Sequence, residues 1–92
     1  MKQFNWNADK NQLLMAERGV SLEDVLYAFQ AGQLLDEVAH PNTEKYPQQR
    51  VFIVCIDDYA WLVPFVETTD EIFLKSIIPS RKATKQYLRR AK

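Results

Sequence analysis

Residues 77–82, Ile-Ile-Pro-Ser-Arg-Lys, are the part of this chain with the clearest potential for chemistry. An apolar pair that leads through proline into basic residues predicts a strand followed by a helix, and the backbone N–H groups at a helix start attract anions. The guanidinium group of Arg81 would match the geometry of a phosphate. The segment is therefore a candidate phosphate site. In the structural alternative, Ser80 only caps the helix, and Arg81 and Lys82 lie on its solvated face.

Lys75 is a second candidate, because it interrupts an apolar run over residues 72–78. Side chains alternate between the two faces of a strand, so Lys75 would share a sheet face with Phe73 and Ile77. A lysine among apolar neighbours either extends its ammonium group to solvent at the sheet edge or points into a site. The sequence leaves both interpretations open.

The charges of the chain are separated along its length. The formal net charge is +0, from 12 basic and 12 acidic residues, but every acidic residue lies within residues 1–71. The last 21 residues hold only basic ones: Lys75, Arg81, Lys82, Lys85, Arg89, Arg90 and Lys92. A cationic end on an acidic body favours a polyanion such as RNA, or an acidic protein partner.

The single cysteine and single histidine restrict the chemistry further. Cys55 cannot form an intramolecular disulfide, and its apolar neighbours favour a buried structural thiol. One histidine and one cysteine do not supply a usual zinc site, so we expect no metal and no cofactor. His40 lies in a polar loop, where exposure to solvent is favoured over a role in proton transfer. Without a signal peptide or an apolar stretch of about 20 residues, we expect a cytoplasmic protein with no membrane partner.

The elements that position these groups begin with a short strand over residues 3–6, where polar and aromatic residues alternate. Asn7 is expected to cap a first helix over residues 8–18, with Gly19 at its end. Leu13 and Leu14 would lie on its buried side.

A second helix is predicted to begin at Ser21. Ser21 and Asp24 form a capping-box-like pair, and Gly32 follows the helix. Apolar residues recur inside it at helical spacing: Val25, Leu26 and Phe29. The two helices together form a predicted αα-hairpin.

Three strand-like runs follow a connection over residues 36–49 that we expect to be exposed. They cover residues 50–56, 60–66 and 71–78, and the short turns between them favour an antiparallel meander. Pro64 inside the middle run suggests an edge strand or a bulge, because proline cannot donate to a ladder. Both faces of the runs are apolar. One face would meet the helices, and the other a terminal element or a partner.

A third helix is expected from about Ser80, with Ala83, Tyr87 and Ala91 along one side. The sum is one domain over residues 1–92 with an α+β fold. In it, an αα-hairpin packs on an antiparallel β-meander with a C-terminal helix.

Four motifs, in the same order along the chain, resemble those of BrnT-type toxins. They are Phe-Asn-Trp-Asn-Ala-Asp-Lys (residues 4–10, for the family's Phe-x-Trp-Asp-x-x-Lys), a Gly-Val-Ser helix junction (19–21), an arginine that opens the meander (Arg50) and Ile-Ile-x-x-Arg-Lys-Ala-Thr (77–84). The last is the most specific. The chain departs from the family at Asn7, where aspartate is usual, and at Arg18, where histidine is usual. Its Arg-Gly-Val-Ser junction also resembles small uncharacterised domains with a similar three-strand core.

The resemblance implies a RelE-like fold and a toxin of a type II toxin–antitoxin module. Such a toxin is a metal-independent endoribonuclease that a cognate antitoxin neutralises, so RNA and antitoxin are the implied partners, in a homodimer or a toxin–antitoxin hetero-oligomer. RelE-like nucleases use arginine, lysine and tyrosine in place of a histidine pair. Matched motif by motif, the catalytic positions are Arg50, Lys75 and Arg81. The candidate substrate-binding residues around them are Ser80, Lys82, Lys85 and Tyr87.

Structural alternatives stand beside two of these roles. Arg50 could instead form an ion pair with Glu67 or Asp57. Tyr87 could face the core or a partner rather than stack on a base.

Two other functions are compatible with the same residues. One is a non-catalytic interaction module that keeps the fold and binds a small partner protein, with activity lost at Asn7 and Arg18. The other is a single-strand RNA binder that does not cleave.

Overall fold

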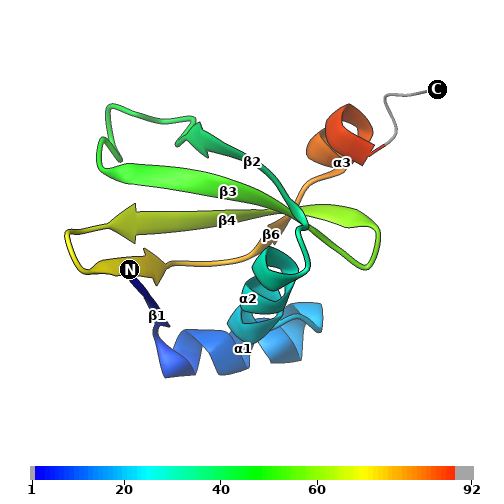
Figure 1. Ribbon diagram of the computed structural model, residues 1–92, viewed down its shortest axis with the longest axis horizontal. Helices are drawn as coiled ribbons and strands as arrows, with labels where there is room; N and C mark the ends of the chain where they lie inside the picture. The colour runs from blue at the N-terminus through cyan, green and yellow to red at the C-terminus, as the bar shows by residue number, and fades with distance from the viewer. Residues whose placement is uncertain (1, 89–92) are drawn as a thin grey trace.

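A mixed β-sheet forms the centre of the structure, which is a computed structural model that describes residues 2–88 (Figure 1). Three helices pack against it, which confirms the α+β class. In chain order, the elements are β1 (Gln3–Trp6), α1 (Ala8–Arg18), α2 (Leu22–Gln30), β2 (Leu34–Ala39), β3 (Gln49–Ile56), β4 (Tyr59–Glu67), β5 (Glu71–Leu74), β6 (Ile78–Pro79) and α3 (Arg81–Leu88).

The first helix begins and ends where the sequence predicts. The Asn7 side chain accepts a hydrogen bond from the Lys10 N–H at 2.9 Å, and Gly19 takes the left-handed conformation (φ 69°) that ends the helix. The prediction for its buried side was half wrong. Leu14 is 1% exposed, whereas Leu13 is 48% exposed, because successive residues point about 100° apart around a helix axis.

The second helix is held by the predicted capping box. The Ser21 side chain accepts from the Asp24 N–H, and the Asp24 carboxylate accepts from the Ser21 N–H. Asn11 of α1 joins the two helices, since its amide oxygen accepts from the Leu22 N–H and its amide nitrogen donates to Glu23. The predicted αα-hairpin is confirmed.

The sheet has the order β1-β5-β4-β3-β2, and β6 pairs with β4. The predicted antiparallel meander is present as β3, β4 and β5. Two features correct it. The strand β1 pairs in parallel with β5, so the sheet is mixed. The segment 36–49 is not all exposed connection, because its start belongs to the edge strand β2, whose adjacent acids Asp36 and Glu37 hid the strand pattern.

The predicted strand over residues 71–78 is interrupted between Leu74 and Ile78. This interruption explains how the sheet accommodates Pro64, which has no N–H to donate. The prediction of an edge or a bulge for Pro64 was wrong, because β4 is a central strand. The Pro64 carbonyl accepts from the Lys75 N–H at 2.7 Å, so the backbone of Pro64 faces β5 and β6. The missing N–H of Pro64 thus falls between Leu62, which pairs with β6, and Phe65, which pairs with β5.

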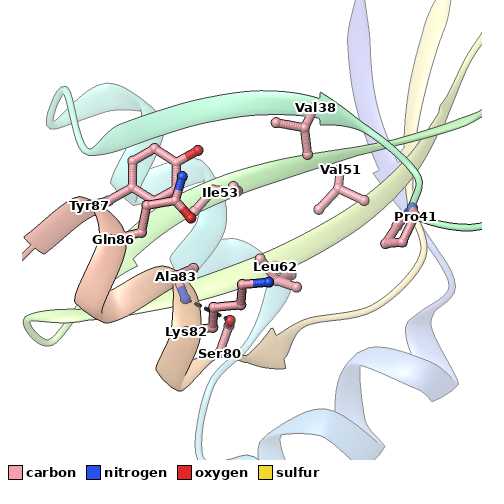
Figure 2. Close-up of a pocket in the computed structure, with 10 residues that line it drawn as sticks. All are labelled: Val38, Pro41, Val51, Ile53, Leu62, Ser80, Lys82, Ala83, Gln86 and Tyr87. Carbon is pink, nitrogen blue, oxygen red and sulfur yellow. Dashed lines mark hydrogen bonds between the residues drawn. The ribbon is translucent and has the colours of Figure 1, made fainter.

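The two faces of the sheet bury different cores. We call the first the helix face: there, α1 and α2 cover alternate residues of the central strands, such as Phe52, Val54, Val63 and Phe65. On the opposite side, the α3 face, Ala83 of α3 packs against Ile53 and Ala60. Figure 2 shows α3 in front of the strands and α2 behind them. The expectation that one face meets the helices and the other a terminal element is confirmed.

Candidate functional site

The motif over residues 77–84 divides into residues that seat α3 and residues that remain at the surface. The Ser80 hydroxyl caps the helix by accepting from the Ala83 N–H at 3.0 Å. The buried Thr84 hydroxyl donates to the Ser80 carbonyl at 2.8 Å and accepts from the Ala60 N–H at 2.9 Å. Ser80, Ala83 and Thr84 therefore hold the start of α3 on β4. The capping role foreseen for Ser80 is confirmed, and its candidate role in substrate binding stays a prediction.

The basic residues of this region lie outside those contacts. Arg81, Lys82 and Lys85 are all exposed on α3, and within residues 2–88 none of them forms an ion pair. Their charges are therefore available to an anion from solution. The predicted Arg89, Arg90 and Lys92, with Ala91, lie outside the described residues.

Lys75 follows the end of β5 and is exposed. Its ammonium group lies 5.4 Å from the centroid of the Phe73 ring, a cation–π distance. Phe73 points to the α3 face, because its neighbour Leu74 is buried in the helix-face core. Ile77, predicted to share a face with both, is instead buried in that helix-face core, since the strand stops at Leu74 and the alternation stops with it. Lys75 thus shares a side of the sheet with α3.

Arg50 does not join these residues. Alternation along β3 places it on the helix face with Phe52, opposite to α3. Its Nε donates to Glu37 Oε2 at 2.8 Å, and both side chains are more than 40% exposed. An ion pair was one of the two interpretations of Arg50, but the partners considered, Glu67 and Asp57, were wrong. Glu37 was missed because β2 was not recognised as a strand.

Tyr87 faces the sheet, as the core interpretation expected. Its hydroxyl donates to Asp36 Oδ2 at 2.6 Å, across 51 residues of sequence. A bulge in β2 makes this possible, since Leu35 and Asp36 together oppose Ile53 and both turn to the α3 face. The hydrogen bond from Tyr87, and then that from the Glu37 N–H, hold the pKa of Asp36 below its ordinary value of 3.8.

A groove of about 300 Å³ opens between α3 and the strands on the α3 face (Figure 2). We call it the α3 groove. Its floor and far wall are apolar, from Val38, Pro41, Val51, Ile53 and Leu62. Ser80, Lys82 and Gln86 supply polar groups along the helix side, where Tyr87 also lines it. Of the candidates, the groove brings together Ser80, Lys82 and Tyr87. Sequence reasoning missed Gln86 and Pro41, for which no motif gave a signal.

The two residues that depart from the BrnT pattern, Asn7 and Arg18, both form hydrogen bonds that stabilise the fold. Asn7 caps α1. Arg18, at the end of α1, donates from Nη1 to the Ile77 carbonyl at 2.7 Å, and so ties the first helix to the segment before β6. His40 accepts from the Asn42 N–H through Nδ1 and lies against the Tyr46 ring, within its own loop.

The described part of the chain contains neither a helix that could span a membrane nor a cluster of metal-ligating side chains. None of the helices between residues 2 and 88 has the length and apolarity needed to cross a bilayer. Over the same residues, no three histidine, cysteine or carboxylate side chains are grouped as metal ligands would be.

No protein-family model, curated protein or solved structure matches this chain. The likeness to BrnT-type toxins therefore stands on the motifs in the sequence, and the site stands on the geometry above.

Proposed function

We propose that this protein is the toxin of a type II toxin–antitoxin module, a metal-independent endoribonuclease that a cognate antitoxin neutralises. One observation carries the proposal beyond the motifs. Lys75, Arg81, Lys82 and Lys85 are exposed on one side of the sheet, and no carboxylate of the described residues pairs with them. Exposed cations without counter-charges attract the backbone of RNA.

The proposed centre consists of Lys75 and Arg81. In cleavage without a metal, the 2′-hydroxyl of the RNA loses its proton to solvent and its oxygen bonds to phosphorus as the bond to the 5′-oxygen breaks. The reaction therefore requires stabilisation of the charge that develops on the phosphate and a proton for the leaving 5′-oxygen. Arg81, at the first turn of α3, is suited to the phosphate. Lys75 carries the ammonium group that can donate the proton. Arg50 is left out of this centre, because it lies on the opposite face and pairs with Glu37.

Lys82 and Lys85 would bind the RNA backbone on either side of the reacting phosphate. Their side chains project from the same short helix as Arg81. Exposed cations of this kind raise affinity in a salt-dependent way and carry no base specificity.

The second candidate function is a non-catalytic interaction module. The α3 groove favours it, because an apolar hollow of about 300 Å³ beside exposed cations suits a side chain of a protein partner.

The deciding experiment incubates the purified chain with end-labelled RNA in EDTA, with and without added ribosomes. We expect cleavage by the wild type and at least a hundredfold slower cleavage by the Lys75→Ala/Arg81→Ala variant, since such groups each contribute about 10²-fold or more. The Lys10→Ala/Lys45→Ala variant removes the same charge elsewhere and should cleave normally. Arg50→Ala should also cleave normally. Absence of cleavage in every condition would contradict the nuclease and favour the interaction module.

A further inference from the structure

We propose that the α3 groove binds an apolar side chain carried by an acidic segment of a partner protein. The inference rests on the proposed function in one respect, because the antitoxin that such a toxin requires would supply the segment. It names the place and the chemistry of that contact.

The groove exists because α3 covers only part of the α3 face. The helix covers Ile53 and Ala60 through Ala83, but it leaves part of the α3 face uncovered between itself and Pro41. Val38, Val51 and Leu62 line that part. Its volume of about 300 Å³ is at the lower end for ligand pockets, which suits one or two side chains rather than a large cofactor.

The charge around the groove favours an anionic partner. Lys82 lines the groove, and Arg81 and Lys85 are exposed on the same helix. The Asp36 carboxylate, which accepts the Tyr87 hydroxyl, forms no ion pair with Arg81, Lys82 or Lys85 in the described part of the chain. An apolar side chain flanked by aspartate or glutamate would therefore find both an apolar floor and unpaired cations.

The lining favours protein over RNA as the occupant. Unstacked bases bind on aromatic rings or guanidinium planes. The floor and far wall of the groove are aliphatic, and Tyr87, the aromatic residue on its helix side, has its hydroxyl bonded to Asp36. Aliphatic walls match leucine, isoleucine or valine more closely than a nucleobase.

The test uses a probe of defined composition. An acetylated 12-residue peptide of glutamate, with leucine at every fourth position, is titrated into ¹⁵N-labelled protein. A matched peptide has serine in place of each leucine, and a 12-nucleotide oligouridine serves as the RNA probe. We expect the leucine peptide to shift the amide signals of groove residues such as Val51 and Gln86, with a Kd at least tenfold lower than that of either other probe.

Two charge reversals on α3 locate the contact. Lys82→Glu changes a lining residue, and Lys85→Glu makes the same change one turn away, outside the groove. Both side chains are exposed, so neither change should disturb folding. We expect Lys82→Glu to raise the Kd of the leucine peptide about fivefold more than Lys85→Glu does.

Other outcomes overturn the proposal. Equal affinity for the serine peptide, or equal effects of the two reversals, would mean a general cationic surface. Tighter binding of oligouridine to the same amides would assign the groove to RNA, and no binding of the leucine peptide up to millimolar concentration would leave the groove without this role. RNA cleavage without selective peptide binding would refute only the groove, whereas peptide binding without cleavage would refute only the nuclease.

Discussion

Tyr87 on α3 donates its hydroxyl hydrogen to Asp36 on β2 at 2.6 Å, and so links the last described helix to the edge strand of the sheet. This contact and the bonds of the Thr84 hydroxyl are among the polar contacts that hold α3 on the sheet. Replacing Tyr87 with phenylalanine should lower the urea midpoint at pH 7, because the Asp36 carboxylate loses a donor while the ring stays. Tyr27→Phe, on a tyrosine that is 74% exposed, is the matched control and should change nothing.

The same pair predicts a pH dependence. The folded pKa of Asp36 is lowered from 3.8, so the contact stabilises the fold above about pH 3.8 and is lost as the pH falls through the lowered value. The difference in stability between wild type and Tyr87→Phe should therefore be constant from pH 5 to 7 and shrink below pH 3.8. Urea unfolding at several pH values measures it. A difference that persists unchanged at low pH would contradict an ionised Asp36 as the acceptor.

Thr84 is 1% exposed, and both its donor and its acceptor functions are used. Thr84→Val keeps the shape of the side chain but leaves the Ala60 N–H without a partner. The free energy of unfolding should therefore fall by about 1–3 kcal/mol. Thr69→Val, on an exposed threonine, should stay within about 0.5 kcal/mol of wild type. Chemical denaturation of the three proteins decides this, and equal stability would mean that the Thr84 hydroxyl does not hold α3.

The β3–β4 turn stores backbone strain. Asp57 and Asp58, the two residues that connect β3 to β4, both have positive φ, at 54° and 62°. Asparagine followed by glycine is the usual choice for such a turn, so Asp57→Asn/Asp58→Gly should stabilise the fold by about 1 kcal/mol. Asp57→Asn/Asp58→Ala removes the same charges but keeps a side chain at positive φ. If that control gains as much stability, charge repulsion rather than backbone conformation is the cause.

Asn11 should control both the helix pair and the titration of Glu23. Its side chain, which is buried, bonds the Leu22 N–H at 2.7 Å and Glu23 at 2.8 Å. Asn11→Ala should destabilise the fold by about 2 kcal/mol, since it leaves the Leu22 N–H unpaired, whereas the neighbouring exposed Gln12→Ala should have little effect.

The titration itself gives the second readout. The Asn11 amide is the main reason that the pKa of Glu23 is lowered from 4.5. In Asn11→Ala, the pKa of Glu23 should rise toward 4.5, which an NMR titration of the glutamate side chains would show. If the variant folds and the pKa of Glu23 is unchanged, the Asn11 amide is not the cause of the lowered pKa.

The local signals in the sequence predicted much of the fold. The ends of the first two helices are set by capping residues, namely Asn7, Gly19, Ser21 and Asp24. Caps were predictable because their hydrogen bonds form within one turn of the helix and do not depend on the rest of the fold. The first two strand-like runs and the start of α3 were also predicted from local pattern, whereas the third run stops at Leu74 and only Ile78–Pro79 resume pairing as β6. The basic residues of the candidate site were also evident, since charge is a property of composition.

Tertiary structure alone decided which of those residues meet. The strand β2 exists because β3 offers it a partner, and its bulge turns Asp36 to Tyr87. Arg50 was separated from Lys75 and Arg81 by the alternation of β3, which puts it on the opposite face with Glu37. The α3 groove is the part of the α3 face that the helix leaves uncovered. Contacts between residues tens of positions apart depend on the register of the strands and on the packing of the helices. The propensity or motif of a single segment specifies neither the register nor the packing.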